Sequence, residues 1–385
     1  MKLLAVLSTL DLKYRLGCTP AWWQLLKALY ENENEVVAVP YLGRDIESLW
    51  WRTKPNPLSV QSELYFHLSR TLKKKGAEGT SHIRETAVQK LTDSFTRPRL
   101  AHHLTKIMEK EGNFDAVIFF NVPLNQIRGI PSELKKRFGV KTVYYDGDMP
   151  TILPENNVKR GFMFDYYQGA DLSEYDLFLV NSEGVMITLK ERGANRVAAL
   201  HYAADPELFQ PLECEKKWDI AFFGYGSQDR TKWMTKMIAD PSKNSSWKIA
   251  VGGKDFGISL GNSSLVGDVP MSAFRRFCCS SKINLNITRE SHTSTYGSST
   301  ARPFELAAMG CCIVSCPYNG LEKWFDKGRE IVIVADDDDI EGIYSELLGN
   351  EKRMMSMGKE IREHVLREHT YRHRSKELID NISRI

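Results

Sequence analysis

The sequence predicts an α/β protein built from two doubly wound domains that face each other across a cleft. Nearly continuous apolar segments of strand length alternate with helix-like segments, which is typical of parallel sheets covered by helices on both faces. The alternation stops at residues 205–219, where two prolines and a charged run intervene, and then it restarts. A length of 385 residues also suits two domains.

The first domain is expected at residues 1–204. It opens with a strand at 2–8 (KLLAVLS), and a helix follows from the Thr-Pro start signal at 19–20 to residue 32. Further strands are predicted at residues 35–41, 114–121, 140–148, 175–182 and 196–205, with a helix ending at Leu189. The stretch from about 50 to 104 is polar and basic, and we expect it to form a helical insertion around the sheet.

The second domain is expected at residues 205–385. Its strands are predicted at residues 218–224, 247–253, 264–269, 282–288 and 328–335, with one more at the end of the segment 298–316. Helices are predicted at 229–239, at 271–281, within 298–316 and at the end of the chain, where the last helix packs back on the first domain. Because such folds bind ligands at the carboxyl ends of their strands, the site is expected in the cleft between the domains.

Composition excludes several classes of function. A net charge of +3, with 26% charged residues, is too mild for a nucleic-acid partner. The seven cysteines include no CxxC pair, so we expect no metal site and a reducing compartment. The apolar run at 3–10 suits a buried strand better than a signal peptide, and the protein is expected to be cytoplasmic. The basic, Trp-containing stretch at 50–75 leaves peripheral contact with an anionic membrane as an alternative to a solvated helical face.

The segment SSTARPFELAAMGCCIVSC (298–316) carries the first candidate site. It is expected to form a helix that starts near Thr300 and ends at Gly310, followed by a buried strand. The positive end of this helix, together with Arg302, suits an anion such as a diphosphate. Glu305, one turn further, can accept hydrogen bonds from paired hydroxyls such as those of a ribose. The alternative is that Glu305 only favours the helix dipole and pairs with Arg302.

The chain resembles a known family in RPFELAAMGCCIVSCPYNGLEKWF (302–325) and in LVNSEGVMITLKERGANRVAALHYAADPELFQP (179–211). These segments resemble the nucleotide-sugar region of glycosyltransferases with two Rossmann-like domains, the GT-B fold. The similarity is greatest to the family-four-like group and to its spore-maturation, CgeB-like branch, and it covers roughly residue 140 to the C-terminus. It implies a hexosyltransferase that uses a nucleotide-diphosphate sugar as donor, needs no other cofactor, and acts on a glycan, lipid-linked or protein acceptor.

The resemblance also implies roles for residues of the second domain. Glu305 matches the family's ribose-binding glutamate, and a cation near the first loop of this domain meets the diphosphate. The candidates for the diphosphate are Gly224, Gly226 and Arg230, with Lys254 after the next strand as a more ambiguous one. Ser298, Ser299 and Thr300 are expected to hold the transferred sugar. Position 297 is Gly, where many retaining members carry a second glutamate, so retention and inversion both stay open.

The first domain is expected to supply the acceptor side. Asp146 and Asp148 follow a strand, and either carboxylate can serve as the base that deprotonates an acceptor hydroxyl. A solvated Asp-Gly turn is the alternative for this pair. Arg15, Gly17 and Thr19, in the first strand-to-helix loop, are the acceptor-side candidates.

Two other functions fit the same sequence features. One is a sugar-nucleotide epimerase, which needs acids on both sides of the sugar. The other is a nucleotide-sugar-binding protein without catalytic activity, and Gly297 gives this alternative some support.

Overall fold

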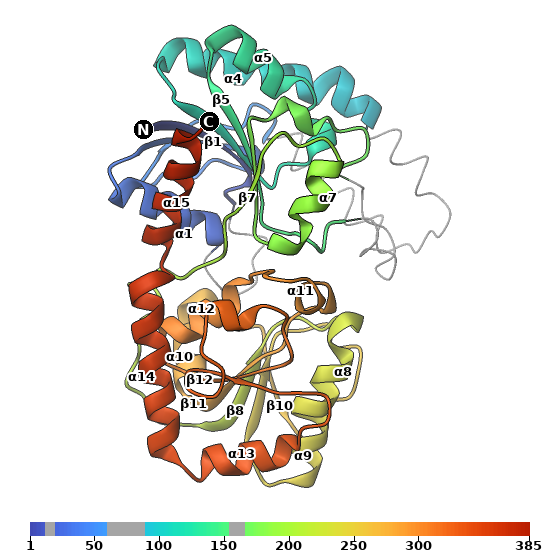
Figure 1. The fold of residues 1–385 in the computed structure, drawn as a ribbon, viewed down its shortest axis with the longest axis vertical. Helices are drawn as coiled ribbons and strands as arrows, with labels where there is room; N and C mark the ends of the chain where they lie inside the picture. The colour runs from blue at the N-terminus through green and yellow to red at the C-terminus, as the bar shows by residue number, and fades with distance from the viewer. Residues whose placement is uncertain (12–19, 60–88, 154–165) are drawn as a thin grey trace.

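The computed structural model describes residues 1–11, 20–59, 89–153 and 166–385. In these residues two parallel sheets, each covered by helices, lie one above the other in Figure 1. The predicted fold class, two doubly wound α/β units, is therefore confirmed. The predicted acceptor-side residues Arg15, Gly17 and Thr19 lie outside the described residues.

The first sheet has seven parallel strands in the order β3-β2-β1-β4-β5-β6-β7. Its strands are β1 (Lys2–Thr9), β2 (Glu35–Leu42), β3 (Arg52–Thr53), β4 (Ala116–Phe120), β5 (Lys141–Asp146), β6 (Leu177–Val180) and β7 (Val197–Ala199). The helices around it are α1 (Ala21–Glu31), α4 (Arg97–Glu111), α5 (Ile130–Phe138) and α7 (Met186–Glu191). All residues of β4 and β6 are buried, as expected for strands covered on both faces.

Part of the stretch predicted as an insertion belongs to the layers of this sheet. Residues Arg52–Thr53 pair with β2 as an edge strand. Helix α4 buries Leu100, Leu104, Ile107 and Met108 in the core that it forms with one face of β1, β2 and β4. These apolar positions follow the helical spacing i, i+4, i+7, i+8, which the surrounding charged residues obscured in the sequence. Residues 60–88 lie outside the described part of the chain.

The second sheet has six parallel strands in the order β10-β9-β8-β11-β12-β13. Its strands are β8 (Trp218–Phe223), β9 (Ile249–Gly252), β10 (Ser264–Gly267), β11 (Ser281–Asn286), β12 (Cys312–Ser315) and β13 (Val332–Ile333). Its helices are α8 (Thr231–Met234), α9 (Asp240–Asn244), α10 (Met271–Cys279), α11 (Glu290–Ser294), α12 (Ala301–Ala308), α13 (Ile340–Leu348) and α14 (Glu351–Glu368). In both sheets the strand order reverses beside the first strand, between β1 and β4 and between β8 and β11.

The final helix returns to the first sheet. Helix α15 (Tyr371–Ser383) follows α14 and packs beside α1, as Figure 1 shows at the left. Its residues Tyr371, Leu378 and Ile382 are buried in the core of the first sheet. The Ser375 hydroxyl donates to the carbonyl oxygen of Ala28 on α1 at 3.2 Å. The C-terminal end of the chain therefore ties the two sheets together.

Glycines let the loops after β8 and β9 touch. The N–H of Gly226 donates to the Lys254 carbonyl at 2.9 Å, and a Cβ on Gly226 would lie 2.0 Å from the carbonyl oxygen of Asp255. A Cβ on Gly253, whose φ is +120°, would lie 1.8 Å from the carbonyl oxygen of Gly224. These glycines serve a contact between two backbone segments at the carboxyl edge of the sheet.

We expect Gly253→Ala to lower the free energy of unfolding by about 2–4 kcal/mol, because the methyl group meets backbone and the φ angle is strained. The shift of the urea midpoint at constant slope measures this loss. Gly257→Ala is the matched control, since its Cβ would meet no atom within 4 Å. Equal midpoints for the two variants would contradict the close approach of the loops.

Candidate functional site between the two domains

The carboxyl edges of the two sheets face each other. Just beyond β6, Ser182 forms an antiparallel bridge with Ser298, which precedes α12 of the other domain. The backbone carbonyl of Asn181 accepts from the Ser299 N–H at 2.9 Å, and the side-chain amide of Asn181 donates to the Ser299 carbonyl at 2.9 Å. The candidate residues 298–305 therefore lie at the junction of the domains.

Ser298 and Ser299, predicted to hold the transferred sugar, are fully buried in this junction. The Ser299 hydroxyl donates to the Asn181 carbonyl and accepts from the Tyr202 N–H, both at 2.9 Å. The Ser298 hydroxyl lies 2.8 Å from His292 Nδ1, and His292 Nε2 lies 3.1 Å from the hydroxyl of Thr151 in the first domain. Both hydroxyls therefore bond to protein groups, and in this arrangement they join the domains.

Helix α12 begins directly after this junction. Thr300 is its N-cap residue, with φ −130° and ψ 156°, and makes no side-chain capping hydrogen bond. Pro303 lies in the first turn, where the missing N–H costs nothing. The first-turn N–H groups of Ala301 and Arg302 thus receive no capping acceptor from Thr300, and the positive end of the helix lies at the interdomain edge.

Arg302 and Glu305 form an ion pair one helical turn apart, with 2.9 Å between Nη1 and Oε2. The Arg302 guanidinium also lies over the rings of Phe274 and Phe223, at 4.3 and 5.0 Å from their centroids, and keeps 20% of its side chain exposed. The Glu305 side chain is 1% exposed, and burial raises the pKa of its carboxyl, which the charge of Arg302 only partly offsets. Because a fifth of the Arg302 side chain is exposed, a ligand can reach Arg302 directly.

The second carboxylate oxygen of Glu305 has no hydrogen-bond partner although it is buried. A buried acceptor in this state costs roughly 1–3 kcal/mol, which a ligand hydroxyl or a water would relieve. Direct contact between Glu305 and a ribose requires the surrounding side chains, Arg302 among them, to move. The ion pair between Arg302 and Glu305, which the sequence offered as the alternative to ribose binding, is present. It leaves one carboxylate oxygen of Glu305 available for a second interaction.

The loop after β8 holds the other donor-side candidates. Arg230 donates to the Tyr225 carbonyl at 2.6 Å, and a Cβ on Gly224 would lie 3.2 Å from Arg230 Nη1. Lys254 lies 5.5 Å from the ring centroid of Tyr225 and pairs with Asp268 at 3.2 Å, with half of its side chain exposed. The structure thus brings Arg230, Gly224 and Gly226 together in one loop, and Lys254 lies in the loop packed against it.

Asp146 and Asp148 lie at the carboxyl end of β5, on the edge of the first sheet that faces the second domain, and their environments differ. Asp146 is 1% exposed, and its carboxylate accepts from the Tyr167 hydroxyl at 2.6 Å and from the Asp148 N–H at 2.9 Å. Burial, followed by the charge of Asp148, raises the pKa of Asp146 to about 7. Asp148 is exposed and accepts from the Asn121 amide at 2.9 Å, so of these two carboxylates it is the one that an acceptor can reach.

A third carboxylate at the junction was not singled out from the sequence. Glu183, just after β6, bonds to His201 Nε2 at 3.1 Å and to Lys323 Nζ at 2.5 Å. Although burial disfavours its charge, these hydrogen bonds lower the pKa of Glu183. Gly297 has a φ of +56°, and a Cβ there would lie 3.4 Å from Glu183. The signal that could have found Glu183 is its position directly after a buried strand.

One group of potential metal ligands lies together in the part of the chain that the structure describes: His364, Glu368 and His369. Arg374 donates to Nδ1 of His369 at 2.9 Å, and burial, followed by the Arg374 charge, lowers the pKa of His369 to about 3. The neutral ring therefore carries its hydrogen on Nε2, which leaves no lone pair for a metal. We assign no metal to this group.

No helix in the described ranges combines the length and the apolar composition that crossing a membrane requires. Membrane contact by the Trp-containing stretch stays a prediction, because residues 60–75 of that stretch are outside the structural description.

Comparison with known proteins identifies the fold. The chain is similar to sucrose-phosphate synthase from Thermosynechococcus elongatus, with a TM-score of 0.67 at 13% identity over 100% of this chain and 99% of that one. It is also similar to Anabaena HepE in complex with UDP, with a TM-score of 0.62 at 10% identity and full coverage of both chains, and HepE was also solved with UDP-glucose. Trehalose-6-phosphate synthase, OtsA, has a TM-score of 0.60 at 11% identity over 100% and 99% of the two chains. At these identities the likeness establishes the GT-B fold alone.

Sequence comparison adds one finding on the second domain. A model of the glycosyl transferase-like family matches residues 208–380. This range includes the whole second sheet with α12 and α14. No curated protein matches the chain. The more specific resemblance to the CgeB-like branch stays a prediction.

Proposed function

We propose that this protein is a glycosyltransferase that moves a hexose from a nucleoside-diphosphate sugar to an acceptor hydroxyl. One observation carries the proposal: α12 starts without a capping side chain at the interdomain edge, and Arg302 and Glu305 lie in its first turn and a half. The match of residues 208–380 to the glycosyl transferase-like family and the GT-B fold support it. UDP is the favoured donor nucleotide, because HepE binds UDP and UDP-glucose in this fold.

In this mechanism the second domain holds the donor. The diphosphate contacts the start of α12 and the guanidinium of Arg302, which is held in place by Glu305 and by the ring of Phe274. As the bond between sugar and phosphate lengthens, negative charge builds up on the leaving diphosphate, and these preorganised groups stabilise it. Arg230 adds positive charge in the loop after β8, whereas the charge of Lys254 is offset by its ion pair with Asp268.

The first domain supplies the base. Asp148 is exposed at the facing edge and takes the proton from the acceptor hydroxyl as the new bond to the sugar forms. Asp146 acts as a positioning residue, because its buried carboxylate accepts the Asp148 N–H and so holds the turn. Closure of the cleft excludes water from the sugar and limits hydrolysis of the donor.

A thermal-shift panel of UDP, GDP, ADP and dTDP, each with its glucose conjugate, tests the donor site. We expect one nucleoside diphosphate to raise the Tm more than its monophosphate does, because the proposed contacts with α12 and Arg302 are made by the diphosphate. A ligand at 100 times its Kd stabilises the folded protein by about 2.7 kcal/mol, which sets the size of the shift. If inorganic pyrophosphate shifts the Tm as far as every nucleotide, or if none of these ligands shifts it, the proposed donor site is wrong.

Product analysis separates the two other functions. An epimerase converts the nucleotide sugar without any acceptor, and a non-catalytic binding protein shows a thermal shift but consumes no donor. A transferase releases the nucleoside diphosphate, and the rate of release rises when an acceptor is added.

A further inference from the structure

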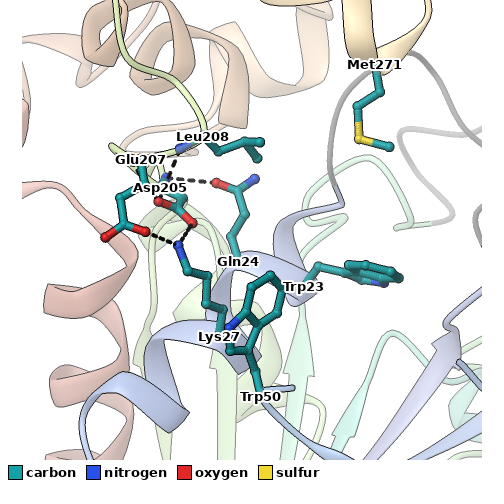
Figure 2. A pocket seen from close by; sticks show the side chains of 8 residues that line it. All are labelled: Trp23, Gln24, Lys27, Trp50, Asp205, Glu207, Leu208 and Met271. Atoms are coloured by element: carbon teal, nitrogen blue, oxygen red, sulfur yellow. Dashed lines mark hydrogen bonds and ion pairs between the residues drawn. The ribbon is translucent and has the colours of Figure 1, made fainter. Parts of the chain in front are cut away.

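A cavity of about 370 Å³ lies outside the donor site, between helix α1 and the segment that links the two domains (Figure 2). One wall belongs to the first domain and the other to residues 205–208 and the start of α10. The residues that line it are Trp23, Gln24, Lys27, Trp50, Asp205, Glu207, Leu208 and Met271. Its volume is in the range of small-molecule sites, roughly 300–1,000 Å³.

Two indole side chains form the apolar part of the first wall, and both have fixed neighbours. The ring of Trp23 meets Trp51 edge-on, with centroids 5.2 Å apart, and Lys27 Nζ lies 5.6 Å from the ring centroid of Trp50. In Figure 2 the Met271 side chain points toward Trp23 from the opposite wall. Because the rings are held by neighbours, little side-chain entropy is lost when a flat ligand packs against them.

The polar part of the cavity is an ionic network that spans both walls. Lys27 Nζ lies 2.7 Å from Asp205 and 2.8 Å from Glu207, and Gln24 accepts from the Asp205 N–H at 2.8 Å. The second oxygen of Asp205 accepts from the Glu207 N–H at 2.9 Å. A second cation, Arg372, lies 3.0 Å from the other oxygen of Glu207, so two cations share the charge of this carboxylate, of which 61% of the side chain is exposed. Lys27, the one cation among the described residues that line the cavity, is engaged by both carboxylates.

We propose that this cavity binds the acceptor, and that the acceptor is a neutral glycan. A pyranose ring has an apolar face of C–H groups that packs on an indole and a rim of hydroxyls that donate to carboxylates, and the cavity offers both. A uronate, sulfate or phosphate group would meet two carboxylates and a Lys27 that both of them already engage, so binding of such an anion here is disfavoured. The proposal rests on the proposed function, because it names the acceptor of that transferase.

The position of the cavity fits this role. Asp205 lies three residues after Tyr202, whose hydroxyl donates to the Gly147 carbonyl at 2.9 Å, between Asp146 and Asp148. The segment 202–205 thus lines the cavity at Asp205 and contacts, through Tyr202, the turn that carries the proposed base. Its second wall includes Met271, at the start of α10, and Phe274 of the same helix lies under Arg302. These two elements connect the cavity to the turn of Asp148 and to the helix that packs under Arg302.

A glycan array with neutral, uronate-containing and sulfated oligosaccharides, probed with the full chain in the presence and absence of UDP, tests the proposal. We expect the wild type to bind neutral glycans and Trp23→Ala to bind them at least about 10-fold more weakly. A 10-fold loss corresponds to about 1.4 kcal/mol, the contribution expected of one stacking contact. Leu208→Ala, on the partly exposed opposite wall, is a second variant with little risk to folding. Tyr30→Ala is the matched control, since Tyr30 is an exposed aromatic residue of the same helix outside the cavity.

Three results would overturn the acceptor site: no glycan is bound by the wild type, only acidic glycans are bound, or Trp23→Ala and Leu208→Ala both bind like Tyr30→Ala. The thermal shift with UDP distinguishes this failure from failure of the proposed function. We expect the shift to be equal in wild type and variants, and a shift lost in Trp23→Ala would assign the cavity to the nucleotide instead. Glycan binding without any nucleotide shift would leave the cavity in place and refute the transferase.

Discussion

Replacing Asp148 by Asn is expected to lower the rate of sugar transfer by about 10²–10⁴-fold while donor affinity stays unchanged. The amide cannot take a proton from the acceptor hydroxyl, yet it keeps the size of the side chain and an oxygen for the hydrogen bond from Asn121. Initial rates with the donor identified by the thermal shift, measured beside the Kd of the nucleoside diphosphate, separate the two effects.

Asp240→Asn is the matched control for this variant, because Asp240 is a half-exposed aspartate on α9, away from the facing edges of the sheets. We expect it to keep the wild-type rate. A loss below 5-fold in Asp148→Asn would show that another group acts as the base, and the first residue to test would then be Glu183.

The pH profile of transfer tests the positioning role of Asp146. Burial raises the pKa of this carboxyl to about 7, so it is protonated below that pH and ionised above it. Its negative charge makes the neighbouring Asp148 a stronger base, so we expect the rate to rise with pH through about 7. Asp146→Asn should keep measurable transfer but lose this rise, and a rise that persists in the variant would exclude Asp146 as its cause.

The same shift has a consequence for stability. The folded-state pKa of Asp146 lies above its ordinary value of 3.8, so ionisation costs more in the folded protein than in the unfolded chain. The contribution of this group to the free energy of unfolding is therefore lost as the pH rises from about 4 to about 7. Asp146→Asn removes that pH-dependent loss, which urea midpoints at pH 5 and pH 8 can measure.

Replacing Arg302 by Met is expected to weaken donor binding by about 10- to 150-fold, because hydrogen bonds to charged groups contribute about 1.5–3 kcal/mol. Met retains contact with Phe274 and Phe223 but has no charge for the diphosphate. Isothermal titration with the nucleoside diphosphate measures the loss. Arg276→Met, an exposed arginine on α10, is the matched control and should bind like the wild type.

The Arg302 variant also leaves the buried Glu305 carboxylate without its ion-pair partner, which destabilises the fold. A double variant, Arg302→Met with Glu305→Gln, removes this charge and is expected to recover most of the lost stability. Donor binding should stay weak in the double variant. Recovery of donor binding together with stability would mean that the pair has only a structural role, as the alternative interpretation of the sequence holds.

Several features of the site depend on contacts that local sequence does not encode. Ser298 and Ser299 were expected to face the sugar, but their hydroxyls bond to the domain junction, where Ser299 meets Asn181, more than a hundred residues away in the chain. Asp146 and Asp148 are two residues apart in a similar composition, yet only one is exposed. Gly226 is a candidate for the diphosphate, and the structure adds that the missing side chains of Gly226 and Gly253 let two loops touch.

The sequence by itself determined the doubly wound fold and the position of α12 at the edge of the cleft. These follow from short-range rules: the spacing of apolar residues, the Thr-Ala-Arg-Pro start and the glycine stop at 310 act within a few residues of each other. Only the tertiary structure decided which polar groups meet across the domains, which carboxylate is desolvated, and where an aromatic cavity forms beside α1. The physical reason is that burial and charge at one residue depend on the segments packed against it, and those segments are distant in sequence.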